Sequence, residues 1–205
     1  DMRELDSGAI LRAEIYTPGI DWPSGDYGGF SSEQWETDPS DEAAAVPRNY
    51  HSVSLLLPDG RILTSGSNFH GGTGHPDVQA EKRIEIYRPW YFDAENRPQI
   101  THRPASVTYD QVFTIETPDA GRVERVAMLR LGSVTHGFDA DQRYVGLTIV
   151  NIGSSTVTVE SPPSGAIAPP GYYMLWIVDE DGLPWREAPF AKLGHQAVVF
   201  VLDRS

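Results

Sequence analysis

The sequence predicts an all-β fold in which part of a β-propeller is followed by a β-sandwich. Short runs of β-branched and aromatic residues recur between turn residues, whereas a helical period of apolar residues is hard to find. The 19 glycines and 16 prolines among 205 residues are typical of short strands joined by many turns. Regularly spaced strands after residue 97 distinguish the second part of the chain from the first.

The first 47 residues contain one clear strand. The apolar segment 13–16 precedes a Pro-Gly pair, which stops a strand. Residues 20–47 are rich in Gly, Ser, Asp, Glu and Pro, with aromatic residues interleaved. We expect a surface loop held by its aromatic side chains, although loops of such length are often functional.

A hairpin and a later strand have the pattern of propeller blades. The hairpin covers residues 53–67, with a Pro-Asp-Gly turn at residues 58–60. The ring of proline fixes its φ at a value that suits a turn, and glycine can take a positive φ. The strand over residues 83–92 repeats the motif Arg-x-Glu-Ile-Tyr-x-Pro that begins at Arg12. A strand and turn that recur after about 70 residues favour propeller blades.

From residue 97 onward, strand patterns follow one another at regular intervals. They cover residues 105–117, 122–131, 144–151, 155–162, 172–185 and 195–203. This pattern predicts an immunoglobulin-like β-sandwich of about 100 residues. We therefore divide the chain into terminal propeller blades over residues 1–96 and a sandwich over residues 97–205. Because one or two blades cannot close a ring, the first part needs further blades from an upstream segment or a second chain.

Composition excludes several classes of function. The net charge of −13 argues against binding to nucleic acid, which needs clustered Lys and Arg. No apolar run is long enough to span a membrane. The chain has no cysteine, and so has no disulfide, no thiolate metal site and no cysteine nucleophile. We expect a secreted or cell-surface protein.

Two places in the sequence offer candidate metal ligands. Tyr50 and His51 are adjacent, and a regular strand would send their side chains to opposite faces. Both reach one atom only if the chain bends where the strand begins; otherwise Tyr50 packs in the blade and His51 caps the loop. His136 lies between two strands in a Gly-Ser-Val-Thr-His-Gly run, which is typical of a loop tip. On spacing alone, each histidine is more often a surface or core residue than a ligand.

Three stretches of the sequence occur in a characteristic order. They are Arg48-x-Tyr50-His51-Ser52 with the following residues 55–61, Thr135-His136 with Asp141-Gln142-Arg143, and Pro170-Gly171-Tyr172-x-Met174-Leu175 with Gly182-x-Pro184. The strand over residues 86–91 and the junction Arg97-Pro98-x-Ile100 fit the same pattern. Over residues 45–190 this order resembles the C-terminal part of the galactose oxidase and glyoxal oxidase family of copper radical oxidases.

The resemblance implies a kelch-type propeller followed by an immunoglobulin-like sandwich, one loop of which reaches the propeller axis. It implies copper as the cofactor, with His51 and His136 as imidazole ligands and Tyr50 as the axial ligand and general base. Imidazoles with a long axial phenolate suit Cu(II). The implied reaction oxidises a primary alcohol or aldehyde, including carbohydrate-derived ones, and reduces O₂ to H₂O₂. Copper supplies one electron equivalent, and a tyrosyl radical on a tyrosine cross-linked to cysteine supplies the other.

The chain departs from this family most clearly in its lack of cysteine. Without one, neither Tyr16 nor Tyr27 can form the cross-linked radical cofactor. We expect that cofactor and most substrate contacts on an upstream segment or a second chain, unless the lineage has lost radical chemistry. A smaller departure lies at residues 64–67, where the family has a more glycine-rich strand end.

Two other interpretations stay open. A non-catalytic propeller-sandwich protein could bind glycans or cell-wall polymers through exposed tryptophans, although tryptophan more often packs in a core. The candidates are Trp22, Trp35, Trp90 and Trp185. The third interpretation is a structural domain whose similarity to the oxidases is incidental.

We expect limited proteolysis to digest residues 1–96 before residues 97–205, because a sandwich buries its own core whereas a blade depends on its neighbours. Mass spectrometry of the protected fragments checks this. Survival of the first part with loss of the second would contradict the division.

Overall fold

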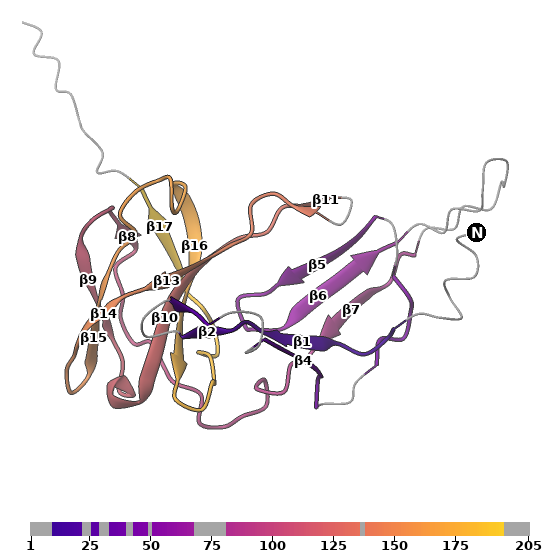
Figure 1. Ribbon diagram of the computed structural model, residues 1–205, viewed down its shortest axis with the longest axis horizontal. Helices are drawn as coiled ribbons and strands as arrows, with labels where there is room; N and C mark the ends of the chain where they lie inside the picture. Colours follow the sequence, from indigo (N-terminus) through magenta and orange to yellow (C-terminus); the bar gives the residue numbers. More distant parts are fainter. Residues whose placement is uncertain are drawn as a thin grey trace, which may run out of the picture.

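The computed structural model describes residues 10–21, 26–28, 33–39, 43–48, 51–67, 81–135 and 138–194. Over these ranges the chain is all-β, and the single helical element is a 3-10 turn, η3 (Ala120–Arg122), which confirms the predicted fold class. None of the described residues belongs to a helix long and apolar enough to cross a membrane. Figure 1 shows a three-stranded sheet beside a larger sandwich, with an arm of the sandwich extending along that sheet.

The three-stranded sheet is antiparallel. Its strands are β5 (Ser52–Leu56), β6 (Ile62–Gly66) and β7 (Ile84–Tyr87). The pairing of β5 with β6 confirms the predicted hairpin. Gly60 has a φ of 87° in the turn, and a Cβ there would lie 3.1 Å from the Tyr91 ring. Glycine is therefore required both by the backbone conformation and by the close approach of Tyr91.

Four short strands precede this sheet: β1 (Glu14–Thr17), β2 (Ile20–Asp21), β3 (Asp26–Tyr27) and β4 (Gln34–Thr37). β1 confirms the strand predicted before the Pro-Gly pair, but the loop predicted over residues 20–47 is wrong where β4 pairs with β1 and β2 pairs with β3. Tyr16 and Trp35 face each other across β1 and β4, with ring centroids 4.7 Å apart. This cross-strand contact supplies the order that local composition does not predict.

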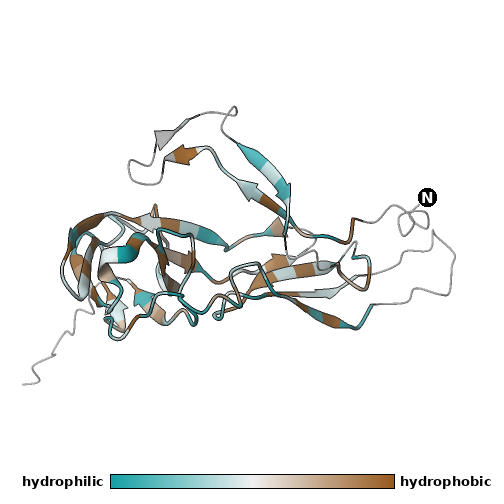
Figure 2. Cartoon of the chain, turned by 90° about the horizontal axis from the view of Figure 1, so that it is seen from below, coloured by the Kyte–Doolittle hydropathy of each residue, from teal (hydrophilic) through white to brown (hydrophobic). Residues whose placement is uncertain are grey.

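The sandwich has two sheets, with the strand orders β13-β10-β16-β17-β8 and β14-β15-β9. Its strands are β8 (Ser106–Val107), β9 (Val112–Glu116), β10 (Val123–Arg130), β13 (Arg143–Leu147), β14 (Ile149–Ile152), β15 (Thr156–Glu160), β16 (Gly171–Asp179) and β17 (Phe190–Leu193). Apolar and polar residues alternate along many of the strands (Figure 2), as expected for sheets that bury one face.

β16 is the exception, because both of its faces are buried. Tyr173, Leu175 and Ile177 pack in the core between the two sheets. Met174 and Trp176 point the other way, into a second cluster that includes Leu56 of the three-stranded sheet. The continuous apolar run of β16 therefore joins the sandwich core to the neighbouring sheet.

The structure differs from several of the predicted strands. The run 105–117 is divided between β8 and β9, which belong to different sheets. The run 144–151, which has the pattern of one strand, is divided at Thr148 between β13 and β14, which belong to different sheets. β17 was not predicted, because its four residues carry only a short alternation of buried and exposed positions. The strand predicted over residues 195–203 lies outside the described residues.

Arg97 fixes the junction between the three-stranded sheet and the sandwich. Its side chain is almost fully buried, with 4% of the residue exposed. Nε donates to the Pro184 carbonyl and Nη2 to the Trp185 carbonyl, both at 2.7 Å. The guanidinium also lies 5.5 Å from the centroid of the Tyr91 ring. Burial lowers the pKa of Arg97 and raises that of Tyr91 to about 12, so the Tyr91 phenol keeps its proton at neutral pH.

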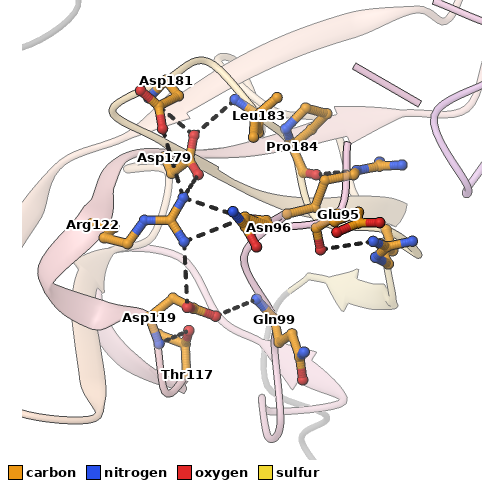
Figure 3. A network of polar contacts seen from close by, with 12 residues as sticks. Glu95, Asn96, Gln99, Thr117, Asp119, Arg122, Asp179, Asp181, Leu183 and Pro184 are labelled. Atoms are coloured by element: carbon orange, nitrogen blue, oxygen red, sulfur yellow. Dashed lines mark hydrogen bonds and ion pairs between the residues drawn. The ribbon is translucent and has the colours of Figure 1, made fainter. Parts of the chain in front are cut away.

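A second arginine ties the same junction to the end of the sandwich (Figure 3). Arg122 donates from both terminal nitrogens to the Asn96 carbonyl at 3.2 Å and forms an ion pair with Asp179, which is fully buried. The other oxygen of Asp179 accepts a hydrogen bond from the Leu183 amide. The charge of Asp179 is therefore compensated on both sides.

We expect Arg97→Ala to lower the free energy of unfolding by about 3 kcal/mol, because two half-buried carbonyls lose their donor and the large buried side chain leaves a gap. Urea denaturation measures this loss. As a control, Arg88→Ala removes an exposed pair with Asp93 and should cost about 0.5 kcal/mol or less. Equal losses in the two variants would contradict the assigned role.

Candidate metal centre

The structure describes one of the three predicted ligands. His51 lies directly before β5, and its side chain is exposed. Its φ of 62° is in the left-handed region, which side-chain-bearing residues seldom adopt. The chain therefore does bend where the strand begins, as a shared Tyr50–His51 site requires. Tyr50 and His136 lie outside the described residues.

An arm of the sandwich reaches the strand that follows His51. The arm consists of β11 (Val134–Thr135) and β12 (Phe138–Asp139), which pair antiparallel with Thr135 opposite Phe138. β11 packs against β5 (Figure 1). The immediate sequence neighbour of His136 thus lies on a strand in contact with the strand that begins after His51.

Gly132 permits this close approach. A Cβ at Gly132 would lie 3.1 Å from Cδ2 of Leu55 on β5 and would also collide with the carboxylate of Asp139. A side chain at this position would require the Leu55 methyl and the Asp139 carboxylate to shift. The sequence signal is weak, because Gly132 stands in an ordinary Leu-Gly-Ser turn segment.

Asp139 holds the base of the arm. Its Oδ1 accepts hydrogen bonds from the backbone amides of Ser133 at 2.9 Å, Gln142 at 2.8 Å and Asp141 at 3.1 Å. The Ser133 amide is the largest cause of the lowered pKa of the Asp139 carboxyl, and the amides of Gln142 and Asp141 add to it. The Asp-x-Asp-Gln pattern, which is typical of an Asx turn, is a signal by which this residue could have been predicted.

The chemistry of the predicted donor set fits copper. Two imidazoles and one phenol are nitrogen and oxygen donors of the kind that Cu(II) takes in a square-based site. Within the described ranges no three His, Cys, Asp or Glu side chains gather to hold a metal. Any copper site built from these candidates therefore depends on Tyr50 and His136 joining His51.

The tryptophans of the glycan-binding interpretation have different surroundings. Trp185 packs against both apolar clusters of the sandwich. Trp35 and Trp90 are exposed, by 68% and 45%. Trp22 lies outside the described residues. Only two of the four candidates are thus seen to be accessible for stacking on a sugar.

Comparison with known proteins assigns the sandwich to a family. Residues 97–186 match the family described as "Galactose oxidase-like, Early set domain". The chain is 32% identical to a galactose oxidase of Gibberella zeae over 187 residues, which is 87% of this chain and 24% of that protein. It is 34% identical to aldehyde oxidase GLOX1 of Arabidopsis thaliana over 157 residues, 69% of this chain and 25% of that protein.

Another curated relative and a solved structure are also similar to this chain. Aldehyde oxidase GLOX of Vitis pseudoreticulata is 37% identical over 147 residues, which cover 65% of this chain and 28% of that protein. Among solved structures, a "novel fungal alcohol oxidase with catalytic diversity among the AA5 family, in complex with copper" aligns with a TM-score of 0.64 and 28% identity, covering 90% of this chain and 41% of that one.

The fold is thus that of an all-β protein with an immunoglobulin-like sandwich, and the arm of this sandwich reaches a neighbouring sheet. Residues 97–186 are a galactose oxidase-like Early set domain, and the chain is homologous to the C-terminal part of galactose oxidases and glyoxal oxidases. The chain spans about a quarter of the length of the curated relatives it matches.

We expect the Asp139 carboxyl to titrate below the usual value of about 3.9 for aspartate. Since the folded pKa is the lower one, the stability that this carboxylate contributes is present above about pH 4 and is lost as the pH falls through the folded value. A carboxyl-carbon NMR titration measures it, with the urea-unfolded chain as the reference. An equal or higher midpoint in the folded chain would contradict the hydrogen bonds assigned to Asp139.

Proposed function

We propose that this chain is the C-terminal portion of a copper-dependent oxidase that converts a primary alcohol or an aldehyde, including carbohydrate-derived ones, with reduction of O₂ to H₂O₂. The observation that carries the proposal is the contact of β11 with β5. β11 ends at the residue before His136, and β5 begins at the residue after His51. The family of the sandwich and the copper-bound oxidase of similar fold support it.

Each candidate has a distinct role in the proposed reaction. His51 and His136 would hold copper through their imidazole nitrogens, and Tyr50 would hold it through its phenol oxygen. The Tyr50 phenolate would accept the hydroxyl proton of the substrate, because a phenolate is a stronger base than the neutral imidazoles beside it. Bound copper would supply one-electron redox chemistry. Over a full turnover an alcohol loses two electrons and two protons to become an aldehyde, and O₂ gains both to become H₂O₂.

The proposal includes an upstream partner and a location. A tyrosine–cysteine radical cofactor cannot form within this chain, because it has no cysteine. We place that cofactor, most substrate contacts and the remaining kelch-type propeller blades on an upstream segment or a second chain. The proposed location is secreted or cell-surface, where O₂ and carbohydrate-derived substrates are accessible.

A second candidate function is glycan binding without catalysis. The exposed Trp35, whose ring lies beside that of Tyr16 at a tilt of 33°, favours it, since an exposed aromatic face offers an apolar surface to a sugar. Under this alternative the protein binds little or no copper, and oligosaccharide affinity depends on Trp35. Copper content therefore discriminates between the two functions.

We expect the natural protein that contains this sequence, with any polypeptide that accompanies it, to bind a single copper ion per particle. His51→Ala and His136→Ala should each abolish that binding, because each removes one of the two proposed imidazole ligands. Elemental analysis after dialysis measures the metal, and an assay for H₂O₂ with alcohols and aldehydes then measures activity.

His102→Ala is the matched control, because His102 is also exposed but lies on the sandwich, in a bridge with Glu116. Its copper content should equal that of the natural protein. If the natural protein contains no copper, or if its copper content is unchanged by the His51 and His136 substitutions, the oxidase proposal is wrong. Glycan binding is then the favoured function.

A further inference from the structure

The backbone of His51 is held in an unusual conformation by its neighbours. Its φ of 62° is positive, and conformations of this kind persist only where surrounding structure imposes them. In the register of β5 and β6, Ser52 lies opposite Gly66, which itself has a φ of 72°. A Cβ on Gly66 would collide with the carbonyl oxygen of His51. The end of β6 is thus packed directly against the His51 backbone.

Arg48 binds this same strand end. Its Nη1 donates to the Gly66 carbonyl at 2.7 Å, and its Nη2 donates to the Arg83 carbonyl at 3.1 Å. Nη2 also pairs with Oε2 of Glu85 on β7 at 2.8 Å. Only 11% of the Arg48 side chain is exposed. A residue just before Tyr50 and His51 is therefore anchored to both neighbouring strands.

Glu85 completes the anchor. While Oε2 receives Arg48, Oε1 accepts a hydrogen bond from the Ala45 amide at 2.6 Å. One carboxylate on β7 thus holds both ends of the segment 45–48. This planar fork of donors and acceptors cannot be reproduced by lysine, whose ammonium is a single point charge.

We propose that Arg48, with Glu85, is a positioning residue that fixes the bend at His51 so that Tyr50 and His51 can both face one copper ion. The inference rests on the proposed function. Arg48 touches no reacting atom; it acts on the ligands through the Gly66 strand end and through the segment before Tyr50. A metal site loses affinity when the residues that orient its ligands are removed, even if every ligand remains.

The experiment measures copper affinity and the Cu(II) electron paramagnetic resonance spectrum in the complete natural protein. We expect Arg48→Lys to weaken copper binding about tenfold or more and to change the copper hyperfine splitting, since the ligand geometry is no longer fixed. Glu85→Gln keeps the shape of the side chain and one acceptor oxygen, but it replaces the other oxygen by an NH₂ donor and removes the charge. It should show a smaller change in the same direction, and it serves as the test if Arg48→Lys does not fold.

Arg88→Lys is the matched control, because Arg88 also pairs with a carboxylate, Asp93, but is exposed and follows the end of β7. It should leave affinity and spectrum unchanged. Natural affinity and spectrum in both Arg48→Lys and Glu85→Gln, with copper still lost in His51→Ala, would overturn the positioning role alone. Copper that does not depend on His51 would overturn the proposed function and this inference together.

Discussion

The structure depends on one buried cation, the guanidinium of Arg97. It lies where the last turn of the three-stranded sheet meets the sandwich, and it donates to the carbonyls of Pro184 and Trp185 beyond β16. A buried charge is tolerated only when its donors are satisfied, so this geometry admits little variation in how the two parts meet. Trp176 and Leu56 add apolar contact across the same boundary. Because the three-stranded sheet and the sandwich are held together here, the arm formed by β11 and β12 keeps a defined position relative to β5.

The arm connects the sandwich to the three-stranded sheet. β10 leads into β11, β12 leads into β13, and β11 packs against β5 (Figure 1). Gly132 allows the approach, and the carboxylate of Asp139 closes the base of the arm on three backbone amides. A histidine carried on such an arm can serve a site in the neighbouring sheet, although the two are far apart in sequence. Asp139 secures one side of the proposed centre and Arg48 the other.

The described residues of the first part of the chain form small sheets and leave apolar side chains exposed. β1 pairs with β4 and β2 with β3 in two-stranded sheets, and isolated sheets of this size are marginally stable in water. Ile84 and Ile86 on β7 are exposed, by 63% and 38%. The chain also spans only about a quarter of the length of the curated relatives it matches. Both observations support the proposal that further propeller blades pack against this part of the chain.

The sequence by itself determined the strand content, the hairpin with its Gly60 turn, the repeated Arg-x-Glu-Ile-Tyr-x-Pro strands and the candidates Tyr50, His51 and His136. These are local matters of alternation, turn chemistry and short motifs. Only the tertiary structure decided the pairing of β4 with β1, the division of residues 144–151 between two sheets, the burial of Arg97 and the contact of β11 with β5. Each of these features depends on a contact between groups that are far apart in the chain. No local sequence pattern specifies which distant strand or carbonyl a given residue contacts.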